Sequence, residues 1–168
     1  MKSEPLKKGS TLSLRGAILA LGAVVLFLCA LPLPTLFRGD IAADAEYADI
    51  AYTFYVILTA VYAAATPFFY ALLQAWRLLG YIDKNKAFSL LSVTALKRIA
   101  VCAVAISAMF AVSLPFFYVW AQHDDAPGLI VIGMIFTAVP LVIAVFAAVL
   151  QRLFKEAIAI KTENDLTV

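Results

Sequence analysis

Residues 128–150 read GLIVIGMIFTAVPLVIAVFAAVL and contain no charged side chain. A helix rises about 1.5 Å per residue, so a stretch of this length crosses a hydrocarbon core about 30 Å thick. Three more uncharged apolar stretches occupy about residues 16–37, 50–76 and 99–121. The four stretches predict an all-α integral membrane protein, a four-helix bundle built from one transmembrane domain over residues 1–168.

The distribution of basic residues predicts how these helices are oriented. Of the 13 Lys and Arg residues, 12 lie before the first stretch, between the second and third, or after the fourth. Only Arg38 lies on the other side. Cytoplasmic segments of membrane proteins are enriched in Lys and Arg, so we expect both termini in the cytoplasm. This orientation explains the net charge of +2, which therefore does not indicate direct binding to nucleic acid.

Composition excludes a soluble protein, because 64% of the residues are apolar, against about half in soluble domains. The segments between the stretches are too short to hold a folded domain. Cys29 and Cys102 are expected at different depths in the membrane, so we expect no disulfide between them. The lipid bilayer is the partner that the composition predicts directly.

Helical patterns continue beyond three of the apolar stretches. The segment from Asp49 to Arg77 is longer than a bilayer needs, and the second helix is expected to start before Ile50. Ser89 is placed to cap the third helix in the cytoplasm. Apolar residues keep helical spacing after Leu150, which predicts a last helix to about Asn164 and a free tail of residues 165–168. Helices 2, 3 and 4 are therefore expected to extend into the cytoplasm or the membrane interface.

One face of the second stretch carries hydroxyl groups. They recur at alternating spacings of three and four residues, which places them on a single helical face: Tyr52, Tyr55, Thr59, Tyr62 and Thr66. We expect this polar seam to point into the bundle. One interpretation is hydrogen bonding and aromatic packing between helices, at about 0.6 kcal/mol per contact. The other is a hydroxyl-lined cavity for a lipid-like or small amphipathic ligand.

Prolines interrupt three of the stretches, at Pro67, Pro115 and Pro140. Each removes a backbone donor and frees the carbonyl four residues earlier. Neighbouring helices in a membrane can satisfy such carbonyls. The prolines are interpreted either as hinges of a moving bundle or as elements that give the helices a fixed shape.

The turn before the fourth stretch places His123, Asp124 and Asp125 together. Asp124 or Asp125 suits the N-cap of the following helix, and Pro127 suits its first turn. The functional alternative is a metal or proton-sensing site, because His titrates near neutral pH and carboxylates supply further ligands. One histidine with scattered acids is a weak metal pattern.

Four short motifs give the chain a resemblance to a known family. They are DKNKAFS at 83–89, DDAPG at 124–128, VFAAVLQ at 145–151 and ENDLTV at 163–168. Together they resemble the DUF2975 family, small bacterial four-span membrane proteins. The resemblance implies the bacterial cytoplasmic (inner) membrane as location and a small helix-turn-helix regulator of the Cro/CI type as partner. It supplies no catalytic residue and no cofactor.

The first hypothesis is therefore a non-enzymatic interaction protein that tethers or senses for a cytoplasmic regulator. Docking is expected on the hairpin between the second and third helices and on the C-terminal tail. The candidate contact residues are Asp83, Lys84, Lys86, Phe88, Glu163, Asn164, Asp165 and Leu166.

The alternative is a small transporter or channel, or an accessory subunit of a membrane complex. Ion pathways usually carry ionisable residues inside the spans, and these four stretches have none. An enzyme is not expected, because the spans lack an HExxH motif, paired aspartates, or a Ser with a base at the same depth. Small residues such as Gly16, Ala20, Ala23 and Gly133 allow close helix contacts within one chain or in a homo-oligomer.

Overall fold

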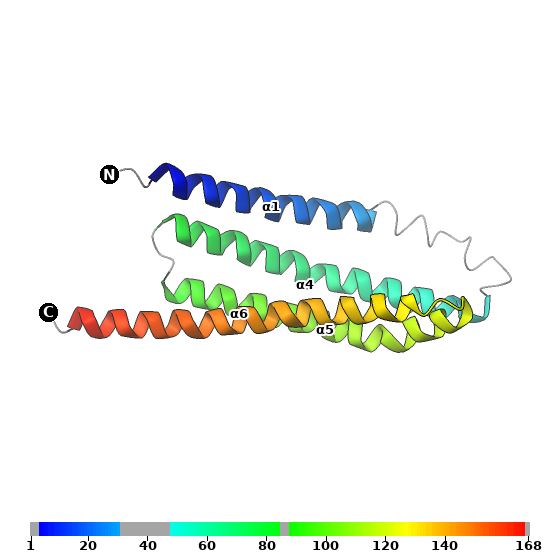
Figure 1. The fold of residues 1–168 in the computed structure, drawn as a ribbon. Helices are drawn as coiled ribbons and strands as arrows, with labels where there is room; N and C mark the ends of the chain where they lie inside the picture. Colours follow the sequence, from blue (N-terminus) through cyan, green and yellow to red (C-terminus); the bar gives the residue numbers. More distant parts are fainter. Residues whose placement is uncertain (1–3, 31–47, 85–87, 167–168) are drawn as a thin grey trace.

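The computed structural model describes residues 4–30, 48–84 and 88–166. Within these residues, four helices are long and apolar enough to cross a membrane, which confirms the predicted all-α architecture. They are α1 (Glu4–Ala30), α4 (Ala51–Asp83), α5 (Leu90–His123) and α6 (Gly128–Leu166), and a short 3-10 helix, η1 (Ala48–Ile50), leads into α4. The helices lie along one long axis, with α1 beginning and α6 ending at the same end of the molecule (Figure 1). We call this the terminal end, and the opposite end, with the α5–α6 turn, the turn end.

The helices are arranged in a row and do not form a closed bundle. The central helix, α5, packs against both α4 and α6, whereas α1 packs chiefly against α4 (Figure 1). Among the α6 residues whose exposure is described, the buried ones are all small: Gly133, Ala144 and Ala147. Membrane helices gain little by hiding large apolar side chains from lipid, so they approach each other through small residues. Most of the large side chains of α6 are therefore exposed.

The α5–α6 interface combines close packing with one hydrogen bond between the helices. The Ser107 hydroxyl donates to the backbone carbonyl of Thr137 at 2.8 Å. The rings of Phe110 and Phe136 stack with centroids 5.3 Å apart. Pro140 lacks the N–H that would bond to the Phe136 carbonyl, so Ser107 supplies a donor close to the point where the α6 ladder is interrupted.

All three prolines predicted to shape the spans lie inside continuous helices: Pro67 in α4, Pro115 in α5 and Pro140 in α6. Near Pro115, the buried hydroxyl of Ser113 donates to the carbonyl of Phe110 at 2.8 Å. The interpretation of these residues as hinges stays a prediction.

Helix ends confirm one sequence prediction and correct two. Ser89 caps α5, its hydroxyl accepting from the backbone N–H of Ser92 at 3.4 Å. The last helix continues to Leu166, two residues past the predicted end near Asn164 and into the predicted free tail. No Gly or Pro follows Leu150 to stop it. Of the predicted free tail, residues 165–166 are helical and 167–168 lie outside the described residues.

The prediction that Asp124 or Asp125 caps the start of α6 is also wrong, because both residues end α5. Asp124 is the C-cap of that helix. Asp125 has a φ of 49°, a left-handed conformation that Asp tolerates, and the next N–H, of Ala126, donates to the Ala121 carbonyl at 2.9 Å. A left-handed residue followed by such a hydrogen bond is typical of the C-terminal end of an α-helix. Pro127 directly precedes the first residue of α6, so it lies one position before the first turn in which it was expected.

Candidate functional site

The terminal end gathers two of the segments predicted to bind a partner. Phe88, just before α5, lies against Phe154 of α6, with ring centroids 5.2 Å apart. This contact fixes the α4–α5 hairpin beside the later part of α6. The C-terminal turns of α6 project beyond the hairpin and beyond the start of α1 (Figure 1). Glu163 and Asn164 are exposed there.

Asp83, one of the predicted contact residues, is engaged within the protein. The Arg15 Nη2 atom donates to Asp83 Oδ2 at 2.6 Å, and the guanidinium carbon lies 5.3 Å from the centre of the Trp76 ring. The Arg15 and Asp83 side chains are 32% and 31% exposed. Arg15, Trp76 and Asp83, which we call the α1 clasp, therefore hold α1 on α4. Lys84 is exposed beside the clasp, and the predicted contact residue Lys86 lies outside the described residues.

The sequence interpretation missed the α1 clasp. Arg15 and Asp83 are 68 positions apart, so no local pattern links them. The one indication in the sequence was that both residues lie at the ends of neighbouring spans, at the same boundary of the membrane. Such a boundary is where an ion pair keeps part of its hydration.

The polar seam exists as one face of α4, but the prediction that it points into the bundle is wrong. Tyr52, Tyr55 and Tyr62 are 53%, 51% and 39% exposed, and Thr59 and Thr66 are exposed as well. The Tyr62 hydroxyl donates to the Cys29 carbonyl of α1 at 2.8 Å, and the Tyr52 ring meets the edge of Phe116 at 6.3 Å. The seam thus contacts α1 through Tyr62 and α5 through Tyr52, and much of it is exposed.

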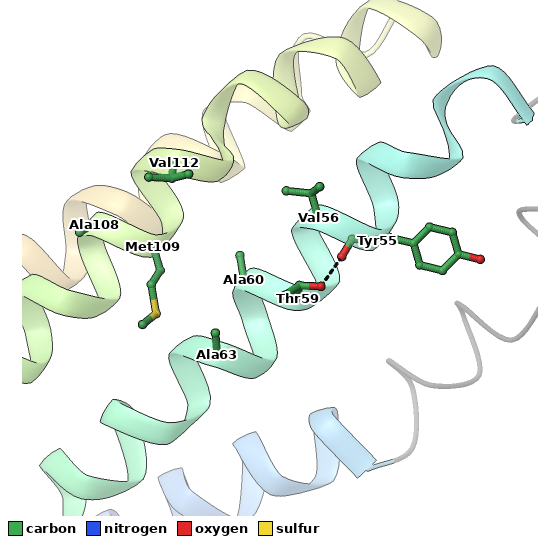
Figure 2. A pocket seen from close by; sticks show the side chains of 8 residues that line it. All are labelled: Tyr55, Val56, Thr59, Ala60, Ala63, Ala108, Met109 and Val112. Carbon is green, nitrogen blue, oxygen red and sulfur yellow. Dashed lines mark hydrogen bonds between the residues drawn. The ribbon is translucent and has the colours of Figure 1, made fainter.

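Beside the seam, a recess of about 540 Å³ lies between α4 and α5. Two seam residues line it, and the rest of its wall is apolar (Figure 2): Tyr55, Val56, Thr59, Ala60, Ala63, Ala108, Met109 and Val112. The Thr59 hydroxyl donates to the Tyr55 carbonyl of its own helix at 2.7 Å. The recess, which we call the α4–α5 groove, is therefore not the hydroxyl-lined cavity that the sequence suggested as an alternative.

At the turn end, the structure places His123 and Asp124 together. The His123 Nδ1 atom is 3.1 Å from Asp124 Oδ1, and the Trp120 indole N–H donates to Asp124 Oδ2 at 2.8 Å. The Trp120 ring also packs edge-on against Phe54 at 4.8 Å. Asp125 turns the chain in its left-handed conformation. Among the residues that the structure describes, no three His, Cys, Asp or Glu side chains gather in a metal-binding group.

Comparisons with known proteins place these features in a family. The family model described as "Protein of unknown function (DUF2975)" matches residues 39–168. The chain is also 52% identical over 159 residues to the "Uncharacterized membrane protein YoaS" of Bacillus subtilis (strain 168), a match that covers 95% of this chain and 98% of that protein. No solved structure matches the chain. The chain belongs to the DUF2975 family, as its four motifs predicted, and is a membrane protein.

Proposed function

We propose that this DUF2975 member is a non-enzymatic interaction protein of the bacterial inner membrane that docks a cytoplasmic protein on its terminal end. Both termini would face the cytoplasm, as the distribution of basic residues favours. The family resemblance supplies the partner class, a small helix-turn-helix regulator of the Cro/CI type. The protein would hold or release that regulator in response to a change in the membrane-spanning helices.

The projecting part of α6 is the observation that carries this proposal. After the apolar stretch ends at Leu150, the helix continues through residues 151–166, about 24 Å at 1.5 Å per residue. The described residues from Ala159 to Asn164 are all exposed. Past the contact of Phe154 with Phe88, this exposed end of α6 would present a docking surface to the cytoplasm.

The exposed surface of this helical end has an apolar face. Leu153 and Ile160, seven residues apart and therefore on one side of the helix, are 53% and 66% exposed. Arg152 and Lys155 can reach the headgroups, which places Ile160 beyond the membrane surface. An amphipathic helix with anchors at this spacing suits insertion into an apolar groove of a partner. We therefore propose that α6 supplies the docking helix and the regulator supplies the groove.

The α4–α5 hairpin provides a second part of the docking surface. Phe88 is 58% exposed although its ring contacts Phe154, so it remains accessible beside α6. Lys84 lies close by at the end of α4. Asp83 is assigned to the α1 clasp and not to the partner. A change in how α1 sits on α4 would thereby alter the surface next to the docking helix.

The test is crosslinking in native membranes, capture of the tagged full-length protein, and mass spectrometry of the retained proteins. Three variants are compared with the unaltered chain: truncation after Thr162, Ile160→Ala, and the matched control Ile132→Ala. Ile132 is also an exposed isoleucine of α6, at 45%, but it lies within the span.

We expect a small DNA-binding protein with the unaltered chain and with Ile132→Ala. Truncation should abolish its recovery, and Ile160→Ala should weaken binding about tenfold, equivalent to about 1.4 kcal/mol. Recovery of membrane proteins alone, or of this protein alone, would contradict the proposal. That outcome would favour the accessory-subunit or transport alternative, which a liposome flux assay then tests.

A further inference from the structure

We infer that the α4–α5 groove binds one acyl chain of a membrane lipid. The groove lies at the depth of the hydrocarbon. Its α4 wall runs from Tyr55 to Ala63, which is about 9 Å along the helix from Asp49 and about 21 Å from Arg77. No charged residue lies between those two positions. The α4 span is therefore uncharged at every height that an acyl chain occupies.

Small side chains create the recess. Ala60 and Ala63 of α4 and Ala108 of α5 leave space that larger residues would fill, and Met109 lies between them as a flexible wall (Figure 2). The volume of about 540 Å³ falls within the range of about 300–1,000 Å³ typical of ligand pockets. The recess covers about 12 Å of α4, much shorter than a helix contact across a bilayer of about 30 Å. Its size favours part of a lipid over a helix of a second copy.

The polarity of the wall selects the class of ligand. Thr59 is the one hydroxyl residue besides Tyr55 in the wall, and its single hydrogen is donated to the Tyr55 carbonyl. The Tyr55 ring points away from the groove (Figure 2). An occupant that required hydrogen bonds would find no donor inside. A saturated or unsaturated hydrocarbon chain gives up no hydrogen bond on entering.

The groove is continuous with the surface that faces lipid. It opens sideways, and on α5 it borders Val112, which is 72% exposed. Val101 and Val104 continue the same exposed apolar surface toward the terminal end, at 60% and 51%. A chain of a neighbouring lipid therefore reaches the groove through hydrocarbon alone, without crossing water or displacing a protein segment.

The experiment uses the full-length protein reconstituted in vesicles that contain a phospholipid with a diazirine on one acyl chain. Irradiation labels the residues next to that chain, and mass spectrometry locates them. The reference is the exposed apolar surface of α6 around Val145 and Phe146, which are 58% and 65% exposed. The groove is filled by Ala63→Leu or Ala108→Leu. Ala138→Leu, at an exposed position of α6, is the matched control.

We expect label at Met109 and Val112 to exceed label at Val145 and Phe146 several-fold. It should fall to the level of the α6 reference in the two groove-filling variants and stay unchanged in Ala138→Leu. Unlabelled phospholipid should also reduce the label in the groove at a lower concentration than it reduces the label on α6. This comparison uses only the unaltered protein, so it remains a test even if the groove-filling variants fail to fold. Equal label at both places, insensitive to filling, would overturn the inference.

Discussion

At the level of single residues, Gly133 shows how little space separates α5 from α6. A Cβ atom at this position would lie 3.0 Å from Cγ of Phe117 and 3.1 Å from Cδ2 of Leu114. Real contacts are rarely this short, so a methyl group forces the rings or the helices apart. Gly16 is the opposite case, since a Cβ there would meet nothing within 4 Å.

We predict that Gly133→Ala destabilises the protein and that Gly16→Ala does not. Both changes raise helix propensity by up to about 1 kcal/mol in water. Only the first adds overpacking, which costs about 1–3 kcal/mol. Thermal unfolding of the detergent-solubilised protein should show a lower midpoint for Gly133→Ala and an unchanged or higher one for Gly16→Ala. Equal shifts would mean that the two helices are not in close contact at Gly133.

The α1 clasp can be tested by removing the Arg15 side chain. Arg15→Ala removes both the ion pair to Asp83 and the cation over Trp76. Because the two charged side chains are about one-third exposed, we expect a loss of only about 1 kcal/mol or less. Trp76 should nevertheless become more accessible to a water-soluble quencher, measured by fluorescence in a Trp120→Phe background. Arg98→Ala, an exposed residue of α5, is the control, and unchanged quenching in Arg15→Ala would contradict the clasp.

At the level of helices, the seam of α4 shows which features a membrane sequence predicts well. The existence of four helices follows from uncharged length, and the Ser89 cap follows from local chemistry. The sequence does not predict which face of α4 turns inward, because lipid and protein interior are equally apolar. Hydroxyl groups do not indicate the buried face either, because a hydroxyl can bond within its own helix. Thr59 and Thr137 donate to carbonyls of their own helices, at 2.7 and 3.0 Å.

Two other differences between the sequence predictions and the structure also have physical causes. Asp serves equally as an N-cap and as a left-handed C-terminal residue, so the motif at 124–125 was compatible with either end of a helix. The α4–α5 groove depends on the register of two helices, and the spacing of alanines in one helix does not determine it. The continuation of α6 past Leu150 was predictable, because apolar spacing continued while charged residues appeared.

The hydrogen bond between α5 and α6 can be tested with two Ala variants. Ser107→Ala removes the donor to the Thr137 carbonyl and should cost about 0.6 kcal/mol, the average for such bonds between membrane helices. Thr94→Ala removes a hydroxyl that donates within its own helix, to Leu90 at 2.8 Å, and should cost less. Chemical unfolding of both variants measures the difference. A larger effect for Thr94→Ala would argue against a role for Ser107 in joining the helices.

At the level of the whole molecule, the two ends of the helix row carry different structural features. The terminal end carries the α1 clasp, the α4–α5 hairpin and the projecting part of α6, whereas the turn end carries the His123–Asp124 pair. The docking proposal requires the terminal end to be cytoplasmic. The orientation of the molecule is therefore the property on which the proposed function depends most directly.

Cysteine labelling tests that orientation. The chain has two free cysteines, which Cys29→Ala and Cys102→Ala remove. Into this background, Gln122→Cys places a thiol at the turn end and Thr162→Cys places one at the terminal end, both at exposed positions. A membrane-impermeant maleimide applied to intact cells should label Gln122→Cys at once and Thr162→Cys only after permeabilisation, because segments rich in Lys and Arg stay in the cytoplasm. The reverse pattern would put the docking helix outside the cytoplasm, where no cytoplasmic regulator could reach it, and would exclude the proposed function even if the fold is correct.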